Sequence, residues 1–315
     1  MKNGHYKKYQ LINFFRLAKK KLKVFKLTKL KKYAGKKLLS AQEGNQVIKE
    51  ALLKATPFVA ARYGANELFV SLESVEIDLK KRTQIRDERM FSLCRNAGFF
   101  PNDKQLGYRY GKLQTMLSNE IDLFSVFGLK MEDYIIDAFG KEDAQVSLPR
   151  AVEPYYFDDP WSSALKGKKV LVIHPFEQSI KKQYAQREKL FSNLEVLPEF
   201  ELYTIQAVQS SAFNKTQFDT WFDALQYMYE KAMAVDFDVA IIGCGAYGLP
   251  LACMLKKAGK TAIHMGGATQ ILFGIKGKRW DNHPIISKLY NEYWIRPLAE
   301  ETPSQAQEIE GACYW

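Results

Sequence analysis

Three glycines between residues 235 and 280 have a spacing that suits the binding of an anion. Gly243, Gly245 and Gly248 follow an apolar run and form the pattern G-x-G-x-x-G at the start of an amphipathic stretch. Glycines in such a turn let a strand lead directly into a helix, whose first backbone N–H groups then face a phosphate. The segment therefore predicts a phosphate site, for either a dinucleotide or another phosphorylated ligand.

A dinucleotide site also needs an acidic side chain about 20 residues after the glycines, where it holds the ribose hydroxyls. In this chain the second strand ends in AIHMGGATQ, with His264 and Met265 at that place, and the next acidic residue is Asp281. An arginine that would accept a 2′-phosphate is missing there as well. The pattern favours another phosphate ligand, and a nicotinamide-dependent oxidoreductase is kept as an alternative.

The same strand opens into a glycine-rich basic loop, GGATQILFGIKGKRW. Three cations within four positions suit the charge of a diphosphate, and the glycines allow the backbone to approach it closely. Phe273 and Trp280 beside the cations favour a folded loop over a solvated hairpin. We therefore expect the glycine turn to hold a diphosphate together with Gly266, Gly267, Gln270, Lys276, Lys278 and Arg279.

A second group of polar residues follows the earlier apolar run in FVAARYGANELFV. Arg62 and Glu67 flank a glycine turn, so the strand would deliver a guanidinium and a carboxylate to its carboxyl end. A guanidinium there can bind an anionic substrate, and a carboxylate can accept a proton or hold a divalent ion. We assign catalytic roles to Arg62 and Glu67 and place Gly64 and Asn66 at the substrate. The alternative is an ordinary helix start capped by Asn66.

A third group lies in VIHPFEQSIKKQYAQR, where a strand ends at His174 and the next helix begins near Glu177 and Ser179. We predict catalytic roles for His174 and Glu177 and substrate binding by Ser179. The alternative is a buried histidine bonded to the backbone and a serine that caps a helix. The convergence of three strand ends on one cleft favours a functional site.

Apolar strands alternate with amphipathic helices through most of the chain. This order predicts a doubly wound, mostly parallel Rossmann-like α/β sheet with helices on both faces, in which ligands bind at the carboxyl ends of the strands. The catalytic domain is expected at 38–315, with an internal seam near 154–168. The expected strands are 57–64, 133–139, 168–175, 201–208, 237–243 and 260–266, and the expected helices are 85–97, 104–127, 178–193, 216–235 and 246–258.

The first 37 residues contain 14 Lys or Arg and no Asp or Glu. Leu11, Phe15, Ala18, Leu22 and Phe25 recur every three or four residues, so one face of a helix would be apolar and the rest basic. The segment is too charged to span a bilayer and lacks the features of a secretory signal. It is predicted either to lie on an anionic membrane surface or to dock onto the domain through its apolar stripe.

The remaining 278 residues contain 32 basic and 35 acidic side chains, so the basic character of the chain belongs to its first segment. We therefore expect no nucleic-acid partner. The four cysteines have neither the spacing of a zinc site nor that of a disulfide framework. These features together indicate a cytoplasmic protein, at the inner face of the plasma membrane if the first segment binds lipid.

The RYGANE segment and the segment from IIGCGAYG to GKRW resemble bacterial glycosyltransferases of the GT-D type, found in adhesin glycosylation and with relatives encoded beside capsule and O-antigen genes. The resemblance covers most of residues 57–282 and rests on these two segments. GT-D enzymes usually read Arg-Phe-Gly-Asp-Gly-Glu in the first one, where Asp-x-Glu holds a divalent ion on the donor diphosphate. Arg62, Gly64 and Glu67 match that motif, and Ala65 stands in place of the aspartate.

The resemblance implies a hexosyltransferase-like enzyme that moves a sugar from a nucleotide-diphosphate sugar to a surface-polysaccharide or lipid-linked acceptor. The resemblance also implies that Glu67 is a ligand of Mn²⁺ or Mg²⁺. With the aspartate replaced, cations of the basic loop and the N–H groups of the glycine turn could instead stabilise the leaving diphosphate. A non-catalytic nucleotide- or sugar-binding relative is the second alternative, because the replaced aspartate could mark a degenerate site.

Overall fold

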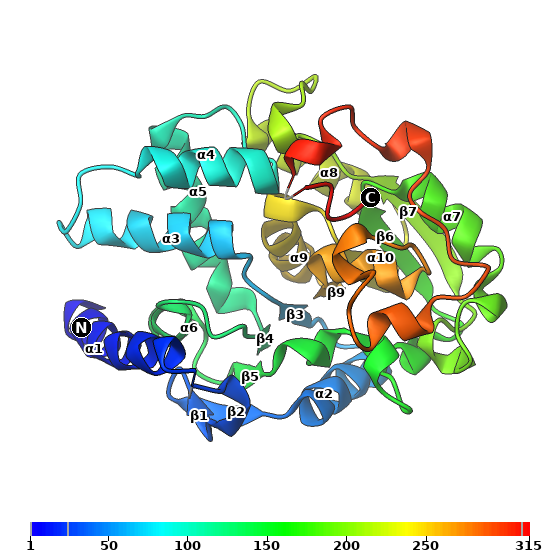
Figure 1. The fold of residues 1–315 in the computed structure, drawn as a ribbon, viewed down its shortest axis with the longest axis horizontal. Coiled ribbons are helices and arrows are strands. Elements are labelled where there is room, and N and C mark those ends of the chain that lie inside the picture. Colours follow the sequence, from blue (N-terminus) through cyan, green and yellow to red (C-terminus); the bar gives the residue numbers. More distant parts are fainter. Residues whose placement is uncertain (1, 24, 310) are drawn as a thin grey trace.

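The computed structural model describes residues 2–23, 25–309 and 311–315 (Figure 1). In these residues nine strands form one sheet, in the order β1-β2-β5-β4-β3-β9-β8-β6-β7. The β1 and β2 strands are antiparallel, and all the other pairings are parallel. The predicted α/β class with a mostly parallel sheet is confirmed.

The strands are short, and the longest have six residues. Their bounds are β1 (Lys32–Tyr33), β2 (Lys36–Leu39), β3 (Val59–Ala61), β4 (Leu123–Ser125), β5 (Gln145–Ser147), β6 (Lys169–His174), β7 (Glu201–Gln206), β8 (Val239–Ile242) and β9 (Thr261–His264). The helices are α1 (Lys2–Lys21), α2 (Ala41–Lys54), α3 (Ala65–Asp78), α4 (Asp87–Ala97), α5 (Lys104–Leu117), α6 (Glu132–Phe139), α7 (Glu177–Tyr184), α8 (Trp221–Met233), α9 (Gly248–Lys257) and α10 (Thr269–Leu272).

Two apolar layers cover the sheet, one on each face. Successive side chains of a strand point to opposite faces, and β6 follows this rule: Val170 and Val172 belong to one layer, Leu171 and Ile173 to the other. The layer with Leu171 contains α3, α4, α5, α6, α8 and α9, and the layer with Val170 contains α2, α7 and α10. Because both faces are buried, the central strands read as continuous apolar runs.

Five of the six predicted strands are confirmed as β3, β6, β7, β8 and β9. The predicted strand at 133–139 is wrong, because these residues belong to helix α6. A short apolar run does not distinguish a buried strand from a buried helix, and Tyr134, Ile135 and Ile136 are all buried. The carboxylate of Glu132 accepts hydrogen bonds from the N–H groups of 127–129, which fixes the chain reversal before this helix.

The predicted helices are present with different limits. The helix expected over 104–127 ends at Leu117, and its last residues form β4 instead. The helix expected over 178–193 ends at Tyr184, and the one at 216–235 is limited to Trp221–Met233. Polar side chains set some of these starts: Asp103 accepts a hydrogen bond from the N–H of Leu106, and Thr220 forms a capping box with Asp223.

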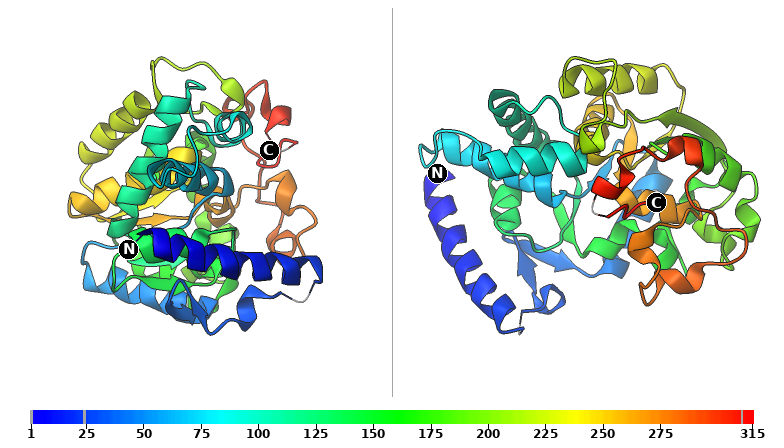
Figure 2. Two further views of the ribbon diagram at one scale, coloured as in Figure 1. Left: turned by 90° about the vertical axis from the view of Figure 1, so that its left-hand side faces the viewer. Right: turned by 45° about the horizontal axis from the view of Figure 1, so that its top comes forward.

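Helix α1 lies along one edge of the molecule beside α6 and the β1–β2 hairpin (Figure 2). It packs on the body through buried Tyr6, Tyr9 and Asn13. The predicted apolar stripe points the other way, since Leu11, Phe15, Ala18 and Leu22 are exposed. The prediction that the segment docks onto the domain through this apolar stripe is therefore wrong. Phe25 of the predicted stripe lies beyond the end of the helix.

The domain limits predicted from the sequence fall inside ordered structure. Residue 37 lies within β2, which pairs with β5 in the main sheet. The segment 154–168 contains two 3-10 turns, Pro154–Tyr156 and Trp161–Leu165, that lead into β6. No helix in the described part of the chain has the length and apolar character needed to cross a bilayer.

Candidate functional site

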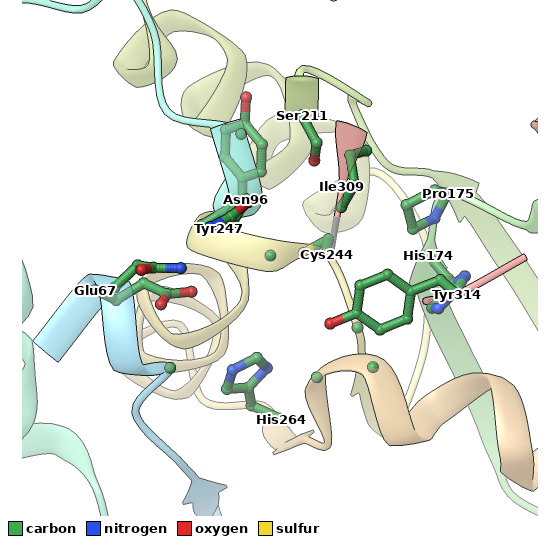
Figure 3. A pocket seen from close by; sticks show the side chains of 18 of the residues that line it. Glu67, Asn96, His174, Pro175, Ser211, Cys244, Tyr247, His264, Ile309 and Tyr314 are labelled. Atoms are coloured by element: carbon green, nitrogen blue, oxygen red, sulfur yellow. The ribbon is translucent and has the colours of Figure 1, made fainter. Parts of the chain in front are cut away.

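A cavity of about 410 Å³ lies where β3, β6, β8 and β9 end. These strands are parallel neighbours in the sheet, so the residues that follow them come together at one edge. Glu67 lies on one side of the cavity and Tyr314 on the other, with His264 below them as drawn (Figure 3). The predicted site residues that line it are Arg62, Gly64, Asn66, Glu67, His174, Gly243, Gly245, Gly266, Gly267, Gln270 and Arg279.

The turn from β3 into α3 places Glu67 at the helix N-terminus. Gly64 is the N-cap residue, with no side-chain cap bond, and Glu67 lies in the first helical turn. A Cβ atom at Gly64 would be 2.1 Å from Oε2 of Glu67, so the glycine makes room for the carboxylate to fold back over the turn. A negative charge is favoured at this end of a helix. The alternative role of Asn66 as cap is wrong, because the cap position belongs to Gly64.

Arg62 is held on several sides at the end of β3. Its Nη1 lies 3.1 Å from Oε1 of Glu153, and both side chains are 13% exposed. The guanidinium carbon lies 5.3 Å from the centre of the Phe127 ring. A Cβ atom at Gly266 would be 3.1 Å from Nη2, so this glycine lets the β9 loop approach the guanidinium. Arg62 is therefore a fixed cation at the wall of the cavity.

Each glycine of the G-x-G-x-x-G turn packs closely against another part of the protein. A Cβ atom at Gly243 would be 2.5 Å from Oγ1 of Thr269 and 2.8 Å from Cδ2 of His174. One at Gly245, which has a φ of 56°, would be 2.6 Å from the carbonyl oxygen of Ala97. One at Gly248 would be 2.2 Å from the His264 ring. Close packing thus accounts for all three glycines, of which Gly243 and Gly245 also border the cavity.

His174 and His264 line the cavity as neutral side chains. Burial lowers the pKa of His174 to about 3, and burial followed by the charge of Arg62 lowers the pKa of His264 to about 3. Nδ1 of His174 accepts a hydrogen bond of 3.0 Å from the N–H of Phe176, which assigns the ring hydrogen to Nε2. Positive charge at the cavity therefore comes from arginine and not from histidine.

The C-terminal residues form the wall opposite Glu67. Tyr314 and Trp315 line the cavity. Backbone hydrogen bonds join this segment to the basic loop: the N–H of Lys278 donates to the carbonyl of Trp315, and the N–H of Arg279 donates to the carbonyl of Cys313. The Arg279 guanidinium lies 4.8 Å from the centre of the Tyr314 ring. Nε2 of Gln270 donates to the carbonyl of Tyr314 at 3.1 Å. The loop is folded, and one of its cations borders the cavity.

Five predicted site residues lie outside the lining of the cavity. Glu177 accepts hydrogen bonds from Thr204 and Lys181, and Ser179 is buried against Glu301. Lys276 lies over the ring of Tyr290, at 5.4 Å from Nζ to the ring centre. Glu177, Ser179, Gly248, Lys276 and Lys278 therefore have packing or hydrogen-bond partners away from the cavity, and the structure does not bring them together with the other predicted site residues.

Sequence reasoning missed several parts of the wall. The residues after β7, 208–211, follow a predicted strand, so their position at a strand end was a usable signal. Phe127 and Leu129 follow β4, a strand of three residues that is too short to show a period. Asn96 at the end of α4 and the C-terminal residues also line the cavity. Their sequences contain no pattern that indicates a functional site.

Few side chains that could bind a metal ion line the cavity. Glu67 is the single acidic side chain among its described lining residues, and no group of three or more His, Cys, Asp or Glu that could hold a metal occurs in the described part of the chain. The end of β9 brings His264 to the place where a dinucleotide site needs an acid. The cavity instead combines one carboxylate with two arginines.

Known proteins offer few matches to this chain. No family model and no curated protein matches it. Among solved structures, it resembles a selenomethionine-substituted structure of the domain of unknown function 1792, with 12% identity, a TM-score of 0.45, and coverage of 75% of this chain and 79% of that one. A second structure, with 12% identity, a TM-score of 0.48 and coverage of 85% and 93%, is of the same domain, described as having a distinct glycosyltransferase fold. The function proposed below rests on the cavity.

Proposed function

We propose that this protein is a glycosyltransferase that moves a sugar from a nucleotide-diphosphate sugar to a glycan acceptor. The observation that supports it is the single carboxylate of Glu67 facing a cavity that Arg62 and Arg279 also border. Its volume of about 410 Å³ falls in the range of small-molecule sites. The acceptor class we propose, from the resemblance of the sequence, is a surface polysaccharide or a lipid-linked glycan.

The donor diphosphate would lie between the two arginines. Gly266 and Gly267 line this side of the cavity, where Gly266 lies against the guanidinium of Arg62 and Gly267 against the ring of Tyr314. Arginine is well suited to this role because its planar fork bonds two oxygen atoms of a phosphate group at once. Since His174 and His264 are neutral, the cations facing the diphosphate would be the two arginines, of which Arg62 also pairs with Glu153.

Glu67 would act as the general base. Its carboxylate accepts the proton of the acceptor hydroxyl while that oxygen forms a bond to the anomeric carbon. The bond from the anomeric carbon to the diphosphate oxygen breaks, and the nucleoside diphosphate leaves with the electron pair. The arginines and nearby backbone N–H groups stabilise the growing negative charge. The Nε2–H of His174 is a neutral donor for a hydroxyl of the sugar.

A divalent ion would have one carboxylate ligand here. Mg²⁺ often binds through one or two carboxylates together with phosphate oxygens, so Glu67 and the diphosphate could hold it jointly. The two roles of Glu67 predict different dependences on added metal. A base needs no ion, whereas a ligand role makes transfer depend on Mn²⁺ or Mg²⁺.

Donor binding is the direct test. Nucleotide-diphosphate sugars should raise the melting temperature of the protein, and incubation with a donor and a polysaccharide acceptor should release nucleoside diphosphate. Both measurements are made with and without Mn²⁺. Titration with NADH, followed by its fluorescence, tests the oxidoreductase alternative. Donor binding without release would favour a non-catalytic binding protein, and binding of NADH but of no nucleotide sugar would overturn the proposal.

A further inference from the structure

Helix α1 exposes several large apolar side chains to solvent on the side away from the body. On α1, Leu11, Phe14, Phe15 and Leu17 are 60%, 66%, 56% and 41% exposed, and Leu22, the first residue after the helix, is 73% exposed. Leu11, Phe14, Phe15 and Ala18 are spaced three and four residues apart, so they share one face of the helix. Exposed apolar residues are ordinary when scattered singly, whereas a contiguous group on one helix marks an interaction surface.

The opposite face of α1 is fixed to the body by polar contacts that determine its rotation. Asn13 donates to Oδ1 of Asp133 at 2.9 Å and accepts from the N–H of Met131 at 2.9 Å. Arg16 pairs with the other oxygen of Asp133, whose side chain is fully buried. Rotating the helix to hide its apolar side chains would break this buried pair and leave an uncompensated charge, which is strongly destabilising. The apolar face is therefore held outward.

Basic side chains surround this face. Lys7, Lys8, Lys19 and Lys21 are exposed on α1, and the exposed Lys23, Lys26 and Lys29 follow it. No acidic residue occurs among the first 37 residues. Exposed leucines and phenylalanines flanked by lysines match the interface of an anionic bilayer, where the rings and aliphatic chains enter the acyl boundary and the ammonium groups contact lipid phosphates.

We propose that α1 is a membrane-docking helix, which binds anionic phospholipid through the face made by Leu11, Phe14, Phe15 and Ala18 together with Leu22 just after the helix, here called the lipid face. The charge supports a bilayer over a second copy of this chain, because two such helices would bring their lysines together. Docking orients the molecule with α1 and the β1–β2 hairpin toward the membrane (Figure 2).

The same helix contacts a wall of the cavity. Nζ of Lys20 donates to the carbonyl of Gly128 at 2.8 Å, and Asn13 binds the N–H of Met131, on either side of Leu129. Phe127 and Leu129 of this segment line the cavity. Docking would thus bring a pocket wall near the bilayer, where a lipid-linked acceptor is found. This last step rests on the proposed function, while the docking itself does not.

The test is sedimentation of the full chain with vesicles of phosphatidylglycerol and phosphatidylcholine in equal parts, and with phosphatidylcholine alone. We expect binding to the anionic vesicles that weakens as salt is raised. Replacing Leu11, Phe14 and Phe15 together by serine should reduce the partition coefficient by at least about tenfold. Replacing Lys7, Lys8, Lys19 and Lys21 by glutamine should reduce it by a similar factor at low salt.

Leu53, Met116 and Leu194 offer a matched control, since they are 63%, 63% and 57% exposed on other elements. Their joint replacement by serine should leave vesicle binding unchanged, and melting temperatures show that each variant is folded. Failure of the wild-type chain to bind the anionic vesicles overturns the proposal. So does unchanged binding by the serine variant of the lipid face, which would show a purely electrostatic contact. A serine variant that changes a dimer into a monomer without altering vesicle binding would assign the face to a second copy.

Donor binding separates this proposal from the preceding one. The lipid-face variants should bind nucleotide sugars as the wild type does, because no substituted residue lines the cavity. A protein that docks on vesicles but binds no nucleotide sugar would retain the membrane proposal and lose the transferase one.

Discussion

The β3–α3 turn and the loop 276–279 both carry charged side chains. The two segments are held in place by different kinds of contact. The turn continues a central strand that pairs with β4 and β9, so its side chains enter a space framed by neighbouring strand ends. The loop is held by backbone bonds to the C-terminal residues, and Lys276 and Lys278 contact Tyr290 and the carbonyl of Gly311. A cluster of charge in a loop can thus serve the packing of the chain, whereas the strand end directs its charge into the cavity.

The largest expected effect is at Glu67. Glu67→Gln keeps the size of the side chain and removes its charge, so we expect transfer to fall by about a hundredfold or more if Glu67 is the base. Glu177→Gln is the matched control, because Glu177 was also predicted to be catalytic but does not line the cavity. Turnover and melting temperature are measured on the same preparations. Equal turnover by the two variants would remove Glu67 from the mechanism.

The next effect concerns Arg279, the loop cation that borders the cavity. Arg279→Ala removes a charge-assisted contact to the diphosphate, and we expect donor affinity to weaken by about 1.5 to 3 kcal/mol, or roughly 10- to 150-fold. Calorimetric titration with a nucleotide-diphosphate sugar measures it. An unchanged dissociation constant would mean that the diphosphate does not reach this side of the cavity.

A smaller effect comes from His264, beneath the turn. Its pKa is lowered from 6.5 to about 3 by burial first and then by Arg62. Between these values the unfolded chain binds a proton that the folded one does not, so the free energy of unfolding rises with pH across this window. The stability is fully present above pH 6.5 and is lost as the pH falls toward 3.

The variant His264→Gln should make the free energy of unfolding less dependent on pH. One proton corresponds to a slope of about 1.4 kcal/mol per pH unit in the steepest part. Urea unfolding at several values between about pH 4.5 and pH 6 measures this slope. The wild-type chain, measured under the same conditions, provides the reference slope. A His264 variant with that same slope would contradict the inferred protonation.

Sequence reasoning reached the strand ends because the strands that precede them are buried apolar runs, which have a clear signature. β3, β6, β8 and β9 were predicted, and with them came Arg62, Glu67 and His174 at the cavity. The C-terminal wall was not predictable in this way. Residues 311–315 fold over the basic loop through backbone bonds, and such bonds carry no periodic pattern.

The orientation of α1 on the body shows a different limit of sequence-based prediction. Hydropathy identifies the most apolar face as the buried one, but here the buried face contains Asn13 and Arg16, which bind Asp133. A buried polar network depends on partners more than a hundred residues away in sequence. The apolar stripe was visible in the sequence, while its direction depended on contacts that the local pattern does not contain.

The smallest expected effect is at Lys278, the matched partner of Arg279 in the same loop. Its side chain is exposed, and Nζ donates to the carbonyl of Gly311 at 3.1 Å, outside the lining of the cavity. An exposed hydrogen bond of this kind contributes little, so Lys278→Ala should lower the free energy of unfolding by about 0.5 kcal/mol or less. Donor affinity should equal that of the wild type, because removing a screened surface charge leaves the diphosphate contacts in place. The measurement is the same calorimetric titration used for Arg279→Ala. If both variants lose affinity equally, the loop acts as one cationic patch, and the distinction drawn between it and the strand-end turn is wrong.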